Sequence, residues 1–441
     1  MTPPDTPAGR DLTVSKLRLL ARGLFLAGMV AIAGCAVPAL PSTPAVSGPT
    51  TGQPGRSPAG SLAAPLVPGL GWVSATVVEA PAQAIELPSG SPAAPLGPGT
   101  AGHPGHFPGQ VLVTGLATDG DRLVAVGSVG LRGSWSPVAW WSDDGDTWRL
   151  AAIAASPPAF AVAVAAAPDG GWVAVGREER RAAVWTSPDG LTWTASPVPP
   201  AGAAAERMTS VTVVDGAYLA GGSAGPELGL RDARLWRSDD GTHWEPVGIP
   251  SPEGTEIRDT SPAGAGWVAV GTIGPAQRPT GSVAWRSPDG AGAPVRLDDE
   301  ELARGLAVAL TRRADGSIVA VGSDADERTA RVWLSSDGGS WEAALGEASR
   351  RHPSVGRIRM TDVVADGGGL VAIGNWVGVQ FGQGTSWRST DGRRWERAPV
   401  QPPLAQSEPA AIVAASDELV AVGTFGAPDN YLPRAWRTPR R

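Results

Sequence analysis

The sequence predicts an all-β fold, a seven-bladed β-propeller of four-stranded antiparallel blades, closed by an N-terminal strand that completes the last blade. Three observations lead to this fold. A Trp-x-Ser-x-Asp-Gly turn occurs six times, and a truncated copy, WRTPRR, ends the chain. A short apolar run ending in glycine precedes each copy, at Gly127, Gly176, Gly222, Gly271, Gly322, Gly374 and Gly423. Runs with strand periodicity fill each interval of about fifty residues, which is typical of a repeat architecture.

The first 34 residues have the pattern of a bacterial lipoprotein signal peptide. Basic residues precede the apolar run GLFLAGMVAIAG, which is too short to span a bilayer as a stable helix. The run ends in Ile-Ala-Gly-Cys35 and resembles a lipobox, in which cleavage falls before a cysteine that receives a diacylglycerol. Because Cys35 is the single cysteine, we expect it to be lipidated and to anchor the mature protein. An ordinary secretory signal with an incidental cysteine is the alternative.

Two tracts rich in Pro, Gly, Ser and Thr lie on either side of a short strand pattern. Residues 35–70 are expected to form a disordered linker, and residues 81–109 a flexible strap within a propeller domain of residues 71–441. Between the tracts, GWVSATVV resembles the fourth-strand sequence TWTASPV of the second unit. The seventh unit supplies three strands and then ends. We therefore predict that residues 72–78 form the outer strand of the last blade, which leaves no open edge.

Each unit contains four strand-like runs in a fixed order. In the second unit these are AVAVAAA, GWVAVG, RAAVWTS and LTWTASPV, separated by turn residues. The other units have the same order. One short helix is expected, in DDEELARGLA around Glu300.

The Ser-x-Asp-Gly turn has a physical explanation. Glycine supplies the positive φ that a tight hairpin needs, and Ser and Asp side chains accept hydrogen bonds from nearby backbone amides. We expect a structural role for the six turn aspartates: Asp144, Asp189, Asp240, Asp289, Asp337 and Asp391. The eleven tryptophans that frame the turns are expected to pack the blades together instead of stacking on sugars or bases.

The charge of the chain restricts its partners. The formal net charge is −7, and it becomes about −9 without residues 1–34. A nucleic-acid partner is therefore not expected, since such proteins carry a basic surface. We expect a monomer at the cell surface or on the periplasmic side of a bacterial membrane, with an unknown protein or glycan partner.

The units resemble the Asp-box (BNR) repeats of sialidases and related bacterial propellers, over most of residues 71–441. The resemblance rests on the Ser-x-Asp-Gly turn and its flanking Trp, although the turn is one residue shorter than the usual S-x-D-x-G-x-T-W. In those proteins the turn joins the third and fourth strands, on the face away from any active site. The resemblance therefore implies a fold and not a catalyst.

The residues of a sialidase site match poorly. Sialidases have six blades, three arginines for the sugar carboxylate, and a Tyr nucleophile with a Glu partner. This chain has seven units, no Arg-Ile-Pro segment before the first turn, and only two tyrosines. Tyr218 lies within a strand pattern and is expected to be structural. Tyr431 is predicted on a loop between a second and a third strand, where it would face a ligand.

Metal and cofactor sites are not expected. The acidic pairs around Asp119 and Asp144 lack the ligand number of a dedicated calcium loop. His103 and His106 lie in the strap without other nearby ligands. No cofactor motif is present.

Ligands are expected on the face formed by the loops that join second to third strands and one blade to the next. Four consecutive units carry an arginine just before the expected innermost strand: Arg207, Arg258, Arg304 and Arg359. These side chains either converge on an anion at the channel mouth, or lie apart and pair with residues such as Asp259, Glu300 and Asp362. Further candidates on exposed loops are Trp135, residues 177–181, Glu227, Arg231, Trp376, Gln380, Phe381 and Tyr431.

The sequence favours a lipid-anchored extracytoplasmic propeller that acts as a non-catalytic scaffold for a ligand or protein. One alternative is a sialidase-like glycoside hydrolase, which a Tyr431–carboxylate pair beside the arginines would favour. The other is a module that binds cell-wall glycans through exposed Trp135 and Trp376. An apolar surface bordered by arginines would favour the scaffold.

Overall fold

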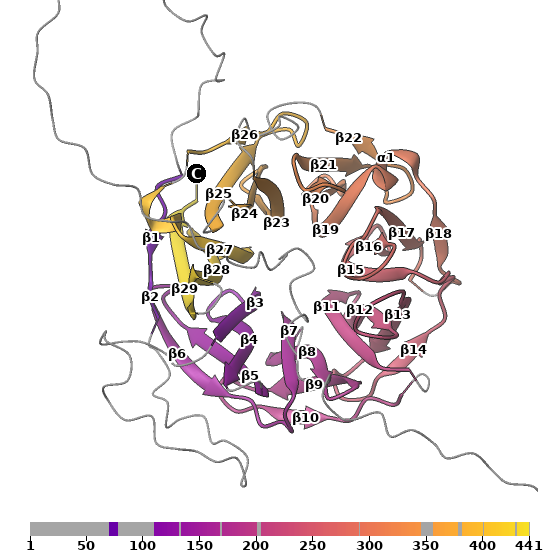
Figure 1. Ribbon diagram of the computed structural model, residues 1–441, viewed down its shortest axis with the longest axis horizontal. Helices are drawn as coiled ribbons and strands as arrows, with labels where there is room; N and C mark the ends of the chain where they lie inside the picture. The colour runs from indigo at the N-terminus through magenta and orange to yellow at the C-terminus, as the bar shows by residue number, and fades with distance from the viewer. Residues whose placement is uncertain are drawn as a thin grey trace, which may run out of the picture.

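The computed structural model describes residues 70–77, 110–131, 134–167, 170–200, 204–290, 292–344, 356–377, 382–399, 401–427 and 430–440. Seven antiparallel sheets stand around a central axis (Figure 1), which confirms the predicted propeller. The signal peptide with Cys35, nearly all of the linker, the strap and Phe381 lie outside the described residues. No helix in the described part of the chain is long and apolar enough to cross a membrane.

The strands of the first four blades have the following bounds. Blade 1 contains β3 (Gln110–Thr118), β4 (Leu123–Leu131), β5 (Ser134–Ser142) and β6 (Thr147–Ala152). Blade 2 contains β7 (Ala159–Ala166), β8 (Trp172–Glu178), β9 (Arg181–Ser187) and β10 (Thr194–Ser196). Blade 3 contains β11 (Glu206–Val214), β12 (Ala217–Ala224), β13 (Asp232–Ser238) and β14 (Glu245–Val247). Blade 4 contains β15 (Thr255–Ala263), β16 (Gly266–Ile273), β17 (Gly281–Ser287) and β18 (Val295–Leu297).

The last three blades continue the same order. Blade 5 contains β19 (Gly305–Arg312), β20 (Ile318–Asp324), β21 (Ala330–Ser335) and β22 (Glu342–Ala343), preceded by the expected helix α1 (Glu300–Ala303). Blade 6 contains β23 (Arg357–Asp366), β24 (Gly369–Val377), β25 (Gly382–Ser389) and β26 (Glu396–Arg397). A 3₁₀ turn, η2 (Pro402–Leu404), leads to blade 7 with β27 (Ser407–Ala414), β28 (Glu418–Ala427) and β29 (Asn430–Pro439).

The recurring glycine of the second strand is explained by a bulge in the first. Every innermost strand has a register shift at the same place, for example between Ala307 and Ala309 in β19. A Cβ added to the glycine opposite, such as Gly322, would lie between 1.8 and 2.2 Å from a backbone carbonyl oxygen in all seven blades. Only glycine therefore permits the close approach that the bulge creates.

The predicted hydrogen bonds of the Ser-x-Asp-Gly turn are present. In the first turn, Ser142 Oγ accepts from the Gly145 amide at 2.9 Å. Asp144 Oδ1 accepts from the two amides that follow the glycine, at 2.9 and 2.7 Å. The second tryptophan, Trp148, closes the turn by donating from Nε1 to the Gly145 carbonyl at 3.2 Å. These bonds hold the hairpin between the third and fourth strands.

The framing tryptophans pack the blades together as predicted. All eleven are buried: Trp140, Trp148, Trp185, Trp193, Trp236, Trp244, Trp285, Trp333, Trp341, Trp387 and Trp395. They belong to six apolar clusters, and a seventh contains Trp72 and Trp436; each cluster is built from residues of neighbouring blades. The core is therefore a ring of interfaces between sheets.

The N-terminal segment closes the ring. Strand β1 (Val73–Ser74) pairs antiparallel with β29 and completes the last blade, as predicted. The expectation was wrong for Thr76–Val77, because β2 (Thr76–Val77) pairs parallel with β6 of the first blade, and Val78 lies outside the described residues. The change of sheet follows Ala75, whose amide donates to the Ala435 carbonyl at 3.0 Å. One segment thus joins both ends of the ring, on the left of Figure 1.

Polar side chains on two inner strands link neighbouring blades. Asp259 Oδ2 accepts from the Leu310 amide of the next blade at 2.7 Å, and Asp362 Oδ2 accepts from the Ile412 amide at 2.8 Å. Protein atoms surround both carboxyl groups, although each side chain retains some accessible surface. This burial raises the pKa of both carboxyls to about 7, and for Asp362 the charge of Asp259 adds to the effect.

Candidate functional site

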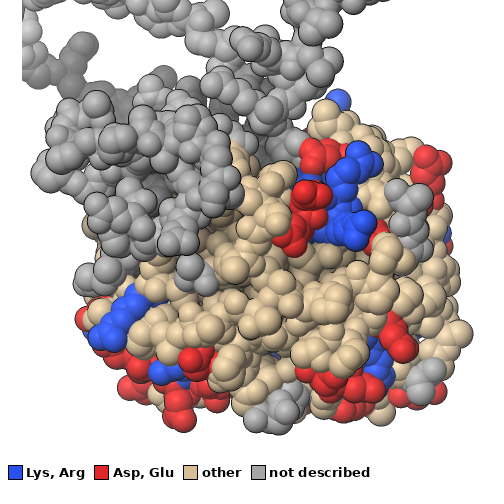
Figure 2. Space-filling view, turned by 90° about the horizontal axis from the view of Figure 1, so that it is seen from below, with Lys and Arg blue, Asp and Glu red and all other residues tan. Residues whose placement is uncertain are grey.

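The two faces of the propeller carry different connections. The Ser-x-Asp-Gly turns, together with the hairpins between first and second strands, lie on one face, which we call the box face. The loops between second and third strands lie at the opposite ends of the strands, on the loop face. In the side view of Figure 2, acidic side chains gather along the lower rim, and a compact group of acidic and basic side chains lies near the upper rim.

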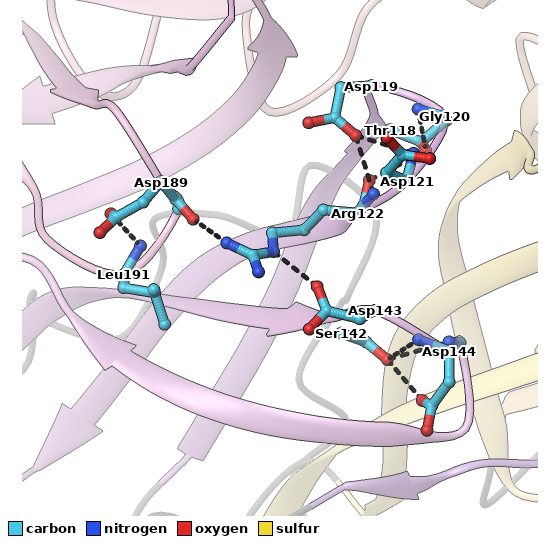
Figure 3. A network of polar contacts seen from close by, with 12 residues as sticks. Thr118, Asp119, Gly120, Asp121, Arg122, Ser142, Asp143, Asp144, Asp189 and Leu191 are labelled. Carbon is cyan, nitrogen blue, oxygen red and sulfur yellow. Dashed lines mark hydrogen bonds and ion pairs between the residues drawn. The ribbon is translucent and has the colours of Figure 1, made fainter.

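Charged groups on the box face connect neighbouring blades. Figure 3 shows Arg122 of blade 1, which donates from Nε to Asp143 at 2.7 Å and from Nη1 to the Asp189 carbonyl of blade 2 at 2.6 Å. Across the closure, Arg437 contacts Asp146 of blade 1 at 3.2 Å. The Asp119 carboxylate accepts two backbone amides, at 3.0 and 2.8 Å, which explains this acidic pair without a metal. These contacts give the box face a structural role.

The loop face gathers arginines from blades 2, 3 and 4, which we call the arginine group. Its members are Arg177, Arg207, Arg231 and Arg258, with the two carboxylates Glu227 and Glu256. Arg177 pairs with Glu227 of the next blade. Arg231 pairs with Glu256 of the next blade through both carboxylate oxygens, at 3.1 and 2.9 Å. Arg258 lies 3.9 Å from the same Glu256.

Arg207 is the least compensated member of this group. The residue is only 4% exposed, and its Nη2 donates to the Gly225 carbonyl at 3.2 Å. Within the described residues, its Nε has no hydrogen-bond partner. Burial, reinforced by the charge of Arg231, lowers the pKa of Arg207 to about 10. The guanidinium nevertheless remains charged at neutral pH.

A second polar group lies on blades 5, 6 and 7. Glu327, in the hairpin after β20, contacts both Arg357 and Arg359 of β23 at 3.4 Å. Arg359 Nε also donates to Asn375 Oδ1 at 3.3 Å. The two arginines of this group thus share one carboxylate, each within 4 Å.

Tyr431 and Glu408 form a hydrogen-bonded pair beside this second group. The Tyr431 hydroxyl donates to Glu408 Oε1 at 3.0 Å. Tyr431 is 3% exposed and belongs to β29, so the sequence prediction of a loop position facing a ligand was wrong. Burial is the main cause that raises the pKa of both groups, and the Glu408 charge further raises that of Tyr431. Both groups are therefore stabilised in their neutral forms.

The four arginines selected from the sequence do not form one ring of contacts. Arg207 and Arg258 belong to the arginine group, and Arg359 belongs to the second group. Arg304 lies after α1, is exposed, and pairs with Glu301 of the same helix. The suggested acceptors Asp259 and Asp362 bind backbone amides, as described above.

The aromatic candidates are partly buried. Trp135 stacks on Phe160 of the next blade at 5.4 Å between ring centroids. The guanidinium of Arg177, which lies buried in a strand and not on an exposed loop, covers the same Phe160 ring at 4.5 Å. Trp376 is half-buried in β24 and packs against the core between blades 5 and 6. Neither tryptophan is the fully exposed platform that a glycan-binding module requires.

Sequence reasoning selected Glu227 but missed the other carboxylates of these groups. Glu256 and Glu408 lie within inner strands, where nothing in the pattern distinguishes them from other polar strand residues. Glu256 immediately precedes Ile257, which borders the bulge, and it occupies the same strand position as Arg207 before Met208. An alignment of the seven units on their bulges would have placed both residues at the loop face.

No protein-family model and no curated protein sequence matches the chain. The structure is similar to that of YCF48 bound to D1 peptide, with a TM-score of 0.50, 13% identity, and coverage of 76% of this chain and 96% of that chain. It is also similar to the Pyrococcus horikoshii acylaminoacyl peptidase, with a TM-score of 0.46, 10% identity, and coverage of 75% of this chain and 52% of that chain. A third similar structure is Trypanosoma rangeli sialidase in complex with sialic acid, with a TM-score of 0.40, 13% identity, and coverage of 75% of this chain and 54% of that chain. The chain spans about half the length of these two enzymes. At such identities the likeness shows the fold alone.

Proposed function

We propose that this protein is a lipid-anchored extracytoplasmic scaffold that binds an anionic protein segment on its loop face and performs no chemistry. The arginine group carries the proposal, since four guanidiniums from three blades surround only two carboxylates. Such an excess of positive charge on a protein that is acidic overall favours an acidic partner at this place.

Two further observations support binding over catalysis. The single histidine among the described residues, His243, lies in a turn of the box face and pairs with Asp240. Since the box face and the loop face lie at opposite ends of the strands, His243 is separated from both polar groups of the loop face by the length of a blade. In addition, the solved structure of YCF48, whose fold is similar, contains a peptide. A propeller of this design is thus suited to hold an extended segment of another protein.

A charge reversal on each face tests the proposal. We expect Arg258→Glu on the loop face to abolish capture of the physiological partner, because it reverses a partly exposed charge beside Glu256. Arg393→Glu on the box face, where Arg393 pairs with the exposed Glu342, is the matched control. Capture would be measured by cross-linking in intact cells followed by mass spectrometry. Equal capture by all three proteins would contradict the loop-face assignment.

The lipid anchor is tested separately, through Cys35. We expect the wild-type protein to partition into the membrane fraction and Cys35→Ser to leave it, since two or more acyl chains are needed for stable anchoring. Fractionation of cells that express each form, with detection by immunoblot, measures this. If Cys35→Ser remains in the membrane, the anchor is not at this residue.

The Tyr431–Glu408 pair favours a second candidate, a glycoside hydrolase. The 3.0 Å hydrogen bond would allow Glu408 to accept the hydroxyl proton of a tyrosine nucleophile. Against this, the pKa of Tyr431 is raised, whereas an activated nucleophile requires a lowered one. Hydrolysis of a fluorogenic N-acetylneuraminic acid glycoside by the wild-type protein but not by Tyr431→Phe would establish the enzyme. No turnover by either protein would leave the scaffold as the function.

A further inference from the structure

Arg207 carries a buried charge that has no direct ion pair in the described part of the chain, and the more distant charges of Glu256 and Glu227 compensate it only in part. Arg177 and Arg231 each have a carboxylate of their own, Glu227 and Glu256. Glu256 already accepts three hydrogen bonds, one from Ser223 Oγ and two from Arg231. No ion pair within 4 Å involves Arg207 among the described residues. A buried guanidinium in this state is unfavourable unless an anion joins it.

One loop connects Arg207 to the protein surface. Residues 225–231 join β12 to β13, and the Gly225 carbonyl at their base accepts the Arg207 hydrogen bond. Arg231 fixes the loop by donating to the Pro226 carbonyl at 3.0 Å and to the Glu227 carbonyl at 2.6 Å. The loop is therefore a rigid border of the arginine group.

The same loop exposes two leucines. Leu228 is 50% exposed and Leu230 is 41% exposed, and both are among the few large apolar side chains exposed on the described surface. The loop is also held from the next blade, because the Gly229 amide donates to Gln277 Oε1 at 2.9 Å. An ordered apolar surface next to an incompletely compensated cation is a combination that recognises ligands carrying both features.

We propose that Arg207 forms the floor of a site for a carboxylate attached to an apolar group, with the apolar group resting on Leu228 and Leu230. This inference rests on the proposed function, and it identifies the ligand as a peptide segment in which a carboxylate adjoins an apolar side chain. The planar guanidinium matches a carboxylate, whose oxygens would accept from its terminal nitrogens, because Nε is enclosed by protein. Since Arg207 is the member of the arginine group with no carboxylate within 4 Å among the described residues, a monoanion suffices to pair with it.

Small probes test the two halves of the site. We expect N-acetyl-leucine to bind the full-length protein, whereas N-acetyl-leucinamide, which lacks the carboxylate, binds about tenfold more weakly or not at all. N-acetylglycine, which lacks the apolar group, is expected to bind about fivefold more weakly. Dissociation constants would be obtained by NMR titration at fixed ionic strength. Equal affinity for the acid and the amide, or inorganic phosphate binding better than acetate, would overturn the proposal.

Three variants assign the effect to residues. Arg207→Met is expected to weaken the binding of N-acetyl-leucine about tenfold. The matched control is Arg304→Met, at an exposed arginine, and it should leave the affinity for N-acetyl-leucine unchanged. Leu228→Ser, which cannot disturb the core, should remove the preference for N-acetyl-leucine over N-acetylglycine. Without ligand, Arg207→Met should melt at the wild-type temperature or above, because it removes an incompletely compensated charge. A large loss of melting temperature would make Arg207 structural and overturn the site.

A final comparison separates this site from the proposed function. A hexapeptide ending in a leucine carboxylate is expected to bind more tightly than N-acetyl-leucine, since a peptide partner contacts more of the loop face. If the hexapeptide and N-acetyl-leucine bind with equal affinity, the carboxylate site exists but its ligand is a small free acid, and the proposed peptide-binding function is wrong. Conversely, partner capture that is lost in Arg258→Glu but retained in Arg207→Met would support the function and overturn the site.

Discussion

At the residue scale, single glycines and aspartates determine the shape of each blade. The glycine that ends each apolar run lies opposite a bulge, and the turn aspartate holds a hairpin. Both residue types recur in the sequence because the same local geometry recurs in every blade. The turn was predictable from its chemistry, since Ser, Asp and Gly have well-defined roles in hairpins. The bulge was not, because it depends on the pairing of two strands.

Gly322→Ala tests the bulge. Its Cβ would lie 1.8 Å from the Leu306 carbonyl oxygen, and this backbone atom cannot move without breaking the β19–β20 pairing. We expect a loss of about 3 kcal/mol in the free energy of unfolding, or failure to fold. Gly248→Ala is the control, because a Cβ there meets nothing within 4 Å. Urea unfolding measures both, and equal stability of the two variants would show that the bulge relaxes easily.

At the element scale, neighbouring inner strands are joined by carboxyl groups whose protonation depends on folding. The folded-state pKa of Asp259 and Asp362, about 7, is raised above the ordinary value of 3.8. The folded protein therefore binds more protons than the unfolded chain between these two pH values. Their contribution to stability is complete below about pH 4 and is lost as the pH rises through about 7.

We accordingly expect the free energy of unfolding to fall between pH 4 and pH 7. Asp362→Asn cannot titrate at this position, so it should reduce this slope, and the remainder comes from Asp259 and Glu408, whose pKa values are also raised. The control is Asp391→Asn in a turn of the box face, where backbone amides lower the pKa of the aspartate. The contribution of Asp391 to stability is lost only as the pH falls below the ordinary pKa of an aspartate. Its substitution should therefore leave the slope of stability between pH 4 and pH 7 unchanged. Urea unfolding across this pH range measures the slopes, and a wild-type slope of zero would contradict the raised pKa values.

The candidate site was only partly predictable from the sequence, because the pairing of its charges depends on the conformation of one loop. The sequence identified the loop face, and it selected Arg207, Arg258 and Arg231 from it. It did not show that Arg231 pairs with Glu256 while Arg207 lacks a carboxylate. Such pairing depends on how residues 225–231 fold back on the blade, where the two ends of the loop lie so close that a Cβ on Gly225 would be 3.1 Å from Arg231 Cα. Loop conformation of this kind leaves no periodic signal in a sequence.

At the scale of the whole molecule, the fold follows from repetition. Seven units of nearly equal length, each unable to bury its apolar faces alone, form a stable structure only when they pack on one another. The number of blades and the position of the turns could therefore be predicted from spacing. The parallel pairing of β2 with the first blade could not, since two residues carry no pattern of their own.

At the closure of the ring, the N-terminal segment around Trp72 supplies a fourth strand and a second tryptophan, which most other blades take from their own unit. In five of the six complete blades, the second tryptophan lies two residues before the residue that pairs with the first; Trp148 and Leu150, opposite Trp140, are an example. In the last blade Trp436 pairs with Ser74, and Trp72 occupies the equivalent position. Trp72 is 3% exposed and donates from Nε1 to Ser386 Oγ of blade 6 at 3.2 Å. It thus replaces the tryptophan that the truncated seventh unit lacks.

Trp72→Ala should therefore destabilise the whole ring. We expect a loss of about 3–5 kcal/mol in the free energy of unfolding, because the substitution leaves a cavity between blades 6 and 7 and removes the bond to Ser386. The neighbouring Val73→Ala, at an exposed position of the same strand, should change stability by less than about 0.5 kcal/mol. Since the ring has no other closing strand among the described residues, the transition of Trp72→Ala in urea should remain cooperative and move as a whole. If only a minor early transition appeared while the main one kept its midpoint, the closing segment would be an accessory to the propeller and not part of its core.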